Sequence, residues 1–500
     1  MNSPVVPASR RRFLTLAGGV LAAPLVLRRT TAFASGEPSD AAWAALAEMM
    51  GEGGLLRRGE PGYREHTRPQ NLRWDLDQPA AVVLPRDPQA IGRAILWARE
   101  QGMPVAARSG GHSYAGSSAG PGLIVNLRRL DGVRFPNPDG EVVELAGGAL
   151  NAGLYAALAD ASRDEEALAI VHGRCSGVGA SAFLMGGGIG FAMRHQGFGC
   201  DAVLGAELVL ADGSIVQCSA DERPDLFWAV RGGGGGNLGI ATRWRMRTWR
   251  SPPVSVFKAV WRSRQRETLA ELFRVLEAAP ASVGSKISVI GHAGGIDLSL
   301  MGQAIAPEGA LEDMVAAPLA SADEHQMARL PYWQAQAFLG DIGHPAHYHE
   351  TSLFVRPLAG NDAALDRLMT LLERHPAAAK GEGAILKFFQ VGGRIGALAP
   401  DATAMPYRGD AWLAGTELEW TERTEQDGRL EQALDWQRAA HAAMQEALPG
   451  ARGSYVNFPD VNLPDPAAAY YGPNLERLRA VRRAVDPDQV FAPPHRQGIG

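Results

Sequence analysis

Two short glycine-rich segments constrain this chain more than any other feature of its sequence. The first, Arg108–Ser113, contains His112, and the second, Gly173–Gly179, contains Cys175. Glycine allows a backbone to approach a ligand closely and to adopt positive φ. Neighbouring amides in such a loop form a concavity that binds anions such as phosphate. Each segment therefore predicts a ligand-binding loop that carries one nucleophilic side chain.

The first 34 residues predict an export signal rather than part of the fold. Arginines in Ser9–Leu14 precede an apolar run, Leu14–Leu27, and Ala32–Ala34 offers a small-residue cleavage site. This order is typical of a twin-arginine signal peptide. A membrane anchor is the alternative, but the apolar run is shorter than the roughly 20 residues that a span needs. We expect a periplasmic or secreted protein that uses the twin-arginine export machinery and leaves the membrane once the signal is cleaved.

Length and charge narrow the class of protein further. Five hundred residues predict two or three domains. Removing residues 1–34 takes away five arginines and no acidic residue, so the mature chain has a net charge of −10. A chain this acidic is not expected to bind nucleic acid. The sequence predicts no metal site, and Cys200 and Cys218 could either pair in an oxidising compartment or remain free buried thiols.

Strands and helices alternate in the first folded region, which we place at residues 35–251. Asp87 and Pro88 supply an N-cap and a first helical residue, and Gly102 ends that helix. The other expected elements are strands at Val105–Ala107, Gly122–Leu127, Val142–Ala146 and Ile240–Trp249, a hairpin over Leu208–Val216 and a helix over Pro224–Val230.

Ser251-Pro252-Pro253 marks a boundary, after which we place a second domain at residues 252–452. It mixes predicted strands, Val254–Trp261 and Ile385–Val391, with a predicted helix, Asp362–Arg374. This mixture predicts an antiparallel sheet covered by helices. The last segment, residues 453–500, is expected to contain a strand from Ser454 onward and a helix over Asn474–Val485.

Further sequence blocks follow the two loops in a fixed order along the chain. They are Gly186–Gly190, Gly199–Val203, Asp225–Gly233, Gly235–Ile240, Thr403–Arg408, Tyr455–Phe458 and Tyr471–Leu478. Together with the loops they resemble the berberine-bridge-enzyme-like group of the vanillyl-alcohol-oxidase family over nearly all of the mature chain. A Rossmann-type fold would instead require a Gly-x-Gly-x-x-Gly spacing after a strand, which Gly186–Gly190 lacks.

The resemblance implies an α+β architecture and a covalent cofactor. It implies a two-part PCMH-type FAD-binding domain, an α+β substrate domain with an antiparallel sheet covered by helices, and a C-terminal segment that returns to the FAD domain. It implies two bonds to FAD, from His112 to the flavin 8α carbon and from Cys175 to C6. The other implied cofactor contacts are Arg108, Ser109, Gly110, Gly111, Ser113, Gly177, Val178, Gly179, Gly187, Gly188, Gly190, Ile240 and Asn457.

The reaction implied by the resemblance is oxidation of a hydroxyl or hemiacetal carbon by hydride transfer to flavin N5. O2 then takes the electrons and hydrogen peroxide leaves. Val178, three residues after the cysteine, is the residue typical of oxidases at a position that tunes oxygen access in the family, although simple packing also explains a valine. The expected substrate is a small molecule, either a sugar or a secondary metabolite. The alternatives are a dehydrogenase and a covalent flavoprotein without net redox turnover, such as a cyclase or a ligand-binding protein.

The catalytic base is the point at which this chain departs from the family. Many members end the Tyr-x-Asn-Tyr segment in a tyrosine base, whereas this chain has Phe458. Tyr455 would face away from position 458 on a strand, and Tyr407 either acts or only packs. Glu417 shares a strand face with Glu419, so it is either a buried base with a raised pKa or part of a solvated face. Hydride abstraction without a base is a further alternative.

Overall fold

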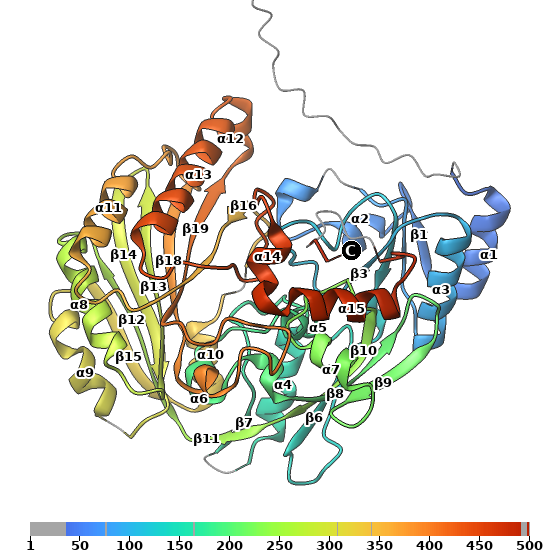
Figure 1. Cartoon of the computed structure of the whole chain (residues 1–500), viewed down its shortest axis with the longest axis horizontal. Coiled ribbons are helices and arrows are strands. Elements are labelled where there is room, and N and C mark those ends of the chain that lie inside the picture. Colours follow the sequence, from blue (N-terminus) through green and yellow to red (C-terminus); the bar gives the residue numbers. More distant parts are fainter. Residues whose placement is uncertain are drawn as a thin grey trace, which may run out of the picture. The chain divides into compact units, whose positions relative to one another are not determined.

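A computed structural model describes residues 37–75, 78–163, 166–307, 309–341, 343–491 and 498–499. The predicted export signal, residues 1–34, lies outside the described residues. Two sheets are built from the first half of the chain, and a third, larger sheet is built from the second half (Figure 1). The fold is therefore α+β, as predicted.

The first sheet has four strands in the order β1-β2-β4-β3, and β2, β4 and β3 run parallel. These strands are β1 (Leu55–Arg57), β2 (Ala81–Val83), β3 (Val105–Arg108) and β4 (Leu123–Asn126). Helices α1 (Asp40–Met50) and α3 (Pro88–Glu100) share its apolar core. Helix α3 begins where predicted, because Asp87 accepts the Ala90 N–H at 2.6 Å. Strand β3 leads directly into the loop that carries His112.

The second sheet is antiparallel, with the strand order β5-β6-β10-β8-β9. Its apolar side chains pack against α4, α5 and α7, and α5 begins directly after the cysteine loop. The elements are β5 (Val133–Arg134), β6 (Val142–Ala146), β8 (Val203–Val209), β9 (Ile215–Ser219), β10 (Ile240–Arg247), α4 (Asn151–Ala161), α5 (Ala180–Met185) and α7 (Pro224–Val230).

The third sheet is antiparallel and has the order β15-β12-β14-β13-β18-β19-β16, with β17 also paired to β19. Its eight strands are β12 (Val254–Trp261), β13 (Val283–His292), β14 (Gly295–Ala304), β15 (Glu324–Leu330), β16 (His347–Glu350), β17 (Leu353–Val355), β18 (Gly383–Gln390) and β19 (Trp412–Trp420). This confirms the predicted antiparallel sheet, and β12 has the predicted bounds.

Helices cover one face of this eight-stranded sheet (Figure 1). They are α8 (Gln265–Glu277), α9 (Ala310–Leu319), α11 (Asp362–Leu372) and α13 (Leu430–Ala447). Their apolar side chains pack on Ile287, Leu300 and Phe388. Residues directly opposite each other on paired strands share a face. The opposite face, which these four helices leave uncovered and on which α10 (Tyr332–Leu339) packs at β12, carries Lys286, which pairs in register with Phe389, and Lys387 two residues away.

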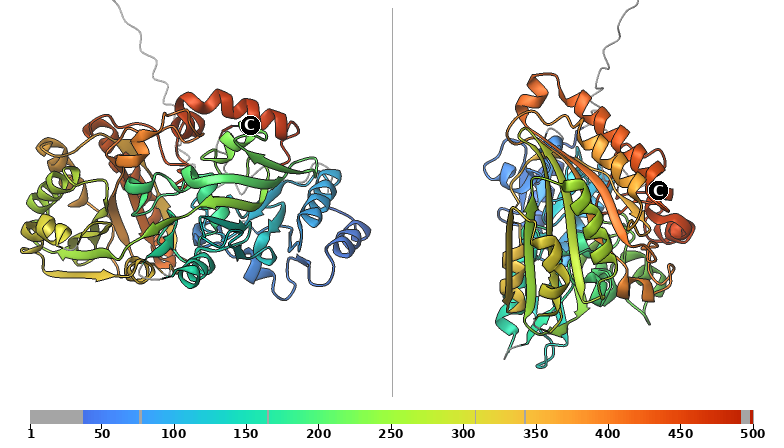
Figure 2. Two further views of the ribbon diagram at one scale, coloured as in Figure 1. Left: turned by 90° about the horizontal axis from the view of Figure 1, so that it is seen from below. Right: turned by 90° about the vertical axis from the view of Figure 1, so that its left-hand side faces the viewer.

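The C-terminal segment returns to the first two sheets, as the resemblance implied (Figure 2). It contains α14 (Pro466–Tyr471) and α15 (Leu475–Val485), whose Tyr471 and Leu478 share the core of the second sheet. The strand predicted from Ser454 onward is wrong, because the described residues after β19 contain no strand. The Ser454 N–H is bonded to the Ala469 carbonyl of α14 instead of to a partner strand.

The remaining elements connect these layers. Strands β7 (Ala167–Ala169) and β11 (Trp249–Ser251) pair with each other, so the strand predicted over Ile240–Trp249 is divided between β10 and β11. Cys200 and Cys218 are both buried free thiols, which answers the question of their pairing. The other helices are α2 (Tyr63–Thr67), α6 (Met193–Gln196), α10 (Tyr332–Leu339) and α12 (Glu422–Gln426).

Candidate active site

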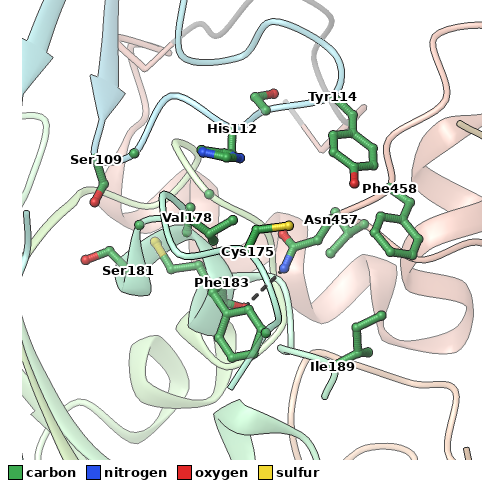
Figure 3. A pocket seen from close by; sticks show the side chains of 18 of the residues that line it. Ser109, His112, Tyr114, Cys175, Val178, Ser181, Phe183, Ile189, Asn457 and Phe458 are labelled. Carbon is green, nitrogen blue, oxygen red and sulfur yellow. Dashed lines mark hydrogen bonds between the residues drawn. The ribbon is translucent and has the colours of Figure 1, made fainter. Parts of the chain in front are cut away.

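An open cleft of about 1770 Å³ is lined by the first two sheets, the uncovered face of the eight-stranded sheet and the C-terminal segment (Figure 3). The histidine loop, the cysteine loop and α5 form one wall. Lys387, Phe389 and Gln390 of β18 form another, and residues 455–459 form a third. This volume includes space that is open to solvent, and the three walls come from parts of the chain that lie far apart in sequence.

The two glycine-rich loops touch each other beside this cleft. A Cβ atom on Gly110 would lie 2.3 Å from the Gly177 carbonyl oxygen, and a Cβ atom on Gly177 would lie 2.7 Å from His112 Nε2. Only glycine permits an approach this close. As a result, loops that are more than 60 residues apart in sequence both direct a side chain, His112 or Cys175, into one cleft (Figure 3).

Burial determines the charge of both nucleophiles. Burial, assisted by the Arg108 charge, lowers the pKa of His112 to about 4, so the imidazole is neutral at pH 7 and its nitrogen lone pair is available. Burial and then Asp341 raise the pKa of Cys175, while Arg174, Lys286 and Lys387 act in the opposite direction. The Cys175 thiol therefore lies within reach of several cationic side chains.

The other predicted cofactor contacts divide into two groups. Ser109, Gly110, Gly111, Ser113, Val178, Gly179, Gly190, Ile240 and Asn457 line the cleft. Arg108, Gly177, Gly187 and Gly188 are not among its lining residues. Arg108 is buried, and its guanidinium donates hydrogen bonds to the backbone carbonyls of Arg68 and Ser118 in neighbouring loops. These four residues therefore lie outside the lining of the cleft.

Neither tyrosine proposed from the sequence presents a free hydroxyl to the cleft. Tyr455 lines the cleft, but its oxygen accepts the Gly188 N–H at 2.9 Å and the Asn457 amide at 3.2 Å. Tyr407 is not a lining residue, and its hydroxyl donates to the Ala469 carbonyl. The prediction that Tyr455 faces away from Phe458 is wrong. The segment is a turn, and the two rings meet edge-on with centroids 5.1 Å apart.

Glu417 belongs to a buried ionic cluster with Lys387 and Glu350. The Lys387 Nζ lies 2.5 Å from the Glu417 carboxylate and 3.0 Å from that of Glu350. Glu350 is 1% exposed and Glu417 is 14% exposed, so the solvated-face alternative is wrong for Glu417. It holds for Glu419, which is exposed. Lys387 lines the cleft, and its Nζ lies 5.7 Å from the centre of the Phe458 ring.

The lysine separates the pKa values of the two carboxyl groups. Burial raises the pKa of Glu350 to about 8, against the opposing charge of Lys387. Burial also raises that of Glu417, but Lys387 outweighs it and brings the pKa to about 2. At neutral pH the cluster therefore holds one carboxylate, one carboxylic acid and one ammonium group. The cluster is therefore neutral overall, and it gains one unit of net charge whenever it accepts or releases a proton.

Sequence reasoning missed Lys387, Glu350 and Tyr114. Tyr114 lines the cleft two residues after His112, and its ring stacks on Phe458 with centroids 5.4 Å apart. A lysine within an otherwise apolar strand was an available signal for Lys387, because a lysine on a buried strand requires partners. Nothing local marked Glu350, whose partners come from other strands.

Two families match this chain. The FAD binding domain family matches residues 79–219, and the family described as berberine and berberine like matches residues 454–500. The chain therefore carries the domains of a berberine-bridge-like FAD-linked oxidoreductase.

Full-length relatives agree with this assignment. This berberine-bridge-like chain is 28% identical to a glucooligosaccharide oxidase of Sarocladium strictum, over 84% of this chain and 87% of the relative. It is equally identical to an uncharacterized FAD-linked oxidoreductase, YgaK of Bacillus subtilis (strain 168), over 89% and 98% of the two chains. The berberine bridge enzyme structure from Eschscholzia californica superposes with a TM-score of 0.80 at 21% identity, over 91% and 98% of the two chains. These matches confirm the predicted PCMH-type architecture.

The cleft of this berberine-bridge-like enzyme fits FAD. Close-packed glycine backbone from both loops and from residues 235–236 borders it, and such backbone approaches a diphosphate closely. The Ser118 hydroxyl lines the cleft and has no partner among the described residues, so it is available to a polar ligand. His112, Cys175 and the lining glycines would hold the cofactor, which supplies a hydride acceptor when bound.

Among the described residues, none of the helices is both long enough and apolar enough to span a membrane.

Proposed function

We propose that the protein is an exported oxidase that removes a hydride from a hydroxyl or hemiacetal carbon of a sugar or a secondary metabolite. The acceptor is FAD bonded to His112 and Cys175, and O2 reoxidises it with release of hydrogen peroxide. The observation that carries the proposal is the convergence of these two side chains on one cleft from separate, touching loops (Figure 3). The oxidases acting on glucooligosaccharides and other carbohydrates among its relatives support the sugar class.

The geometry around His112 favours its role as an attachment point. Its ring is largely buried and neutral, and it is held against Gly177, so the nitrogen lone pair is free of protons at neutral pH. Cys175 provides the second bond from the facing loop. Two bonds prevent loss of a cofactor that an exported enzyme could not replace.

The Lys387–Glu350–Glu417 cluster replaces the missing tyrosine base. Lys387 lines the cleft, donates a hydrogen bond to Glu417, and its Nζ lies 3.0 Å from a carboxyl oxygen of Glu350. In the proposed step the substrate hydroxyl gives its proton to Lys387 while Lys387 passes one of its own protons to Glu417. Glu417 becomes neutral, so the cluster carries one net positive charge until the proton leaves to solvent. Val178 lines the cleft, as Cys175 does, and in this proposal its short side chain allows O2 to reach the flavin.

The test of the proposed function is a turnover assay on purified holoenzyme with a panel of alcohols and sugars. We expect bleaching of the flavin absorbance under anaerobic conditions and stoichiometric peroxide in air. Fast bleaching with negligible oxygen uptake would identify a dehydrogenase. An absence of bleaching across the panel would identify a redox-silent flavoprotein.

The covalent bonds are tested separately by acid precipitation. We expect yellow colour to stay with the denatured chain in wild type and in each of His112→Ala and Cys175→Ala, and to be released only from the double variant. Release from wild type would refute the linkage. Export is tested by cell fractionation of the Arg10→Lys/Arg11→Lys variant, which we expect to remain in the cytoplasm. Secretion unaffected by that change would refute the twin-arginine route.

A further inference from the structure

A second group of charged side chains lies on the uncovered face of the eight-stranded sheet, apart from the Lys387 cluster. Met301 of β14 pairs in register with Lys258 of β12 on one side and with Lys286 of β13 on the other. Directly opposite residues share a face and lie about 4.5–5.5 Å apart at Cβ. Two lysines therefore flank one methionine on this face. Neither lysine is among the residues that line the cleft, and the Lys258 ammonium lies 4.9 Å from the ring centre of Phe338 in α10.

A third cation meets this row from the opposite wall. Arg174, which precedes Cys175, lines the cleft, and its guanidinium lies 3.4 Å from the Met301 sulfur. The Lys286 ammonium lies 5.4 Å from the ring centre of Phe389, another lining residue. Arg174, Lys258 and Lys286 thus converge on Met301 from two parts of the fold.

None of these three cations forms an ion pair among the described residues, although Asp341 acts on Lys258, and Glu417 and Glu350 act on Lys286, from farther away. Among the described residues, no Asp or Glu oxygen lies within 4.0 Å of a charged nitrogen of Arg174, Lys258 or Lys286. Lys387 on the same face differs, because two carboxyl groups neutralise it. Burial and then the Arg174 charge lower the pKa of Lys286 to about 7, which reflects the cost of gathering these cations. All three side chains are half-buried, and gathering like charges away from water favours the binding of a counter-charge.

We propose that this trio, Arg174, Lys258 and Lys286, binds a carboxylate of the substrate, so that the enzyme oxidises hydroxy compounds that carry an acid group. The proposal rests on the proposed function and specifies its substrate class. A guanidinium recognises a carboxylate through paired N–H donors, and Arg174 is adjacent in sequence to the predicted cofactor anchor. A substrate held by its carboxylate at Arg174 would place its hydroxyl carbon between Cys175, the predicted flavin anchor, and Lys387, which both line the cleft.

Binding tests the proposal without turnover. Oxidised holoenzyme is titrated with benzoate and with its neutral analogue benzamide, and the change in flavin absorbance is followed. We expect benzoate to bind about 10–100-fold more tightly, the range of one charged hydrogen-bonded contact. Lys286→Met should remove most of this preference and Lys286→Arg should retain it. Lys380→Met, which changes an exposed lysine outside the cleft, should have no effect.

Equal affinities for the two probes, or a preference that survives Lys286→Met, would overturn the proposal. Acid precipitation first confirms that each variant carries flavin, so a binding defect is not a loading defect. Turnover of glucose against glucuronate then separates the two hypotheses. A benzoate preference with no flavin reduction by any alcohol overturns the proposed function and leaves the anion site standing. Reduction by glucose with no benzoate preference does the reverse.

Discussion

Replacing Arg408 with methionine tests the contact that joins the Thr403–Arg408 segment to residues 199–202, directly before β8. The Arg408 guanidinium donates to both carboxylate oxygens of Asp201, at 2.9 and 2.8 Å, and to the Thr403 hydroxyl at 2.7 Å. The side chains of Arg408 and Asp201 are 1% and 5% exposed. Without the guanidinium, the Asp201 carboxylate would stay buried with the Phe198 N–H, at 2.9 Å, and the weak Cys200 thiol donor, at 3.7 Å, as its remaining hydrogen-bond donors.

The expected cost follows from this geometry. Breaking a buried ion pair by removing one partner destabilises a protein by about 3–5 kcal/mol, because the other charge is left uncompensated. A methionine keeps most of the packing volume, so the charge dominates the effect. Adding Asp201→Asn removes the stranded charge. The double variant should therefore recover at least about 1 kcal/mol relative to Arg408→Met alone.

The assay is equilibrium urea unfolding of the holoenzyme, followed by both circular dichroism and flavin fluorescence. Agreement of the two probes checks that unfolding is cooperative. Arg423→Met is the matched control, because Arg423 is 78% exposed and its 3.5 Å pair with Asp427 lies at the surface, where such pairs contribute about 0–1 kcal/mol. A loss below about 1 kcal/mol for Arg408→Met, or a double variant less stable than the single one, would refute the reasoning.

Three further changes have definite expected outcomes. Gly177→Ala places a methyl group 2.7 Å from His112 Nε2, so peptide mapping should find less flavin on the His112 peptide; full occupancy would contradict the close approach. Phe458→Tyr should change kcat by less than about tenfold if a proton acceptor is already present, since a general base contributes about 10²–10⁴; a larger gain would show that the natural site lacks one. The Arg429 hydrogen bond lowers the pKa of Glu382 from 4.5 to about 2, so the stability that Glu382 provides is complete above pH 4.5 and is lost as the pH falls toward 2. Melting temperatures should thus depend less on pH between 5 and 3 in Glu382→Gln than in wild type, and parallel curves would contradict this.

Local chemistry explains which elements the sequence predicts well. Strand β6 and helix α7 have the predicted bounds, and α3 starts at the predicted cap, because alternation, Pro at N1 and a capping aspartate act over a few residues. The glycine spacing of the two loops likewise predicted that His112 and Cys175 would lie in ligand-binding loops. Such features need no knowledge of distant contacts.

Features that depend on strand register escaped prediction. Lys387, Glu417 and Glu350 lie on β18, β19 and β16, and only the pairing of those strands brings them together. A one-residue shift in register would have moved each side chain to the other face. The strand expected from Ser454 failed for a related reason, because the bonding partner of that segment proved to be α14, which lies later in the chain.

The returning C-terminal segment imposes an order on biosynthesis. Residues 455–459 form a wall of the cleft, and the Val490 carbonyl accepts the Val105 N–H at the strand that leads to His112. That wall is missing until almost the entire chain has left the ribosome. The cofactor therefore binds late in synthesis. A prematurely terminated chain would lack this wall of the cleft and would stay colourless.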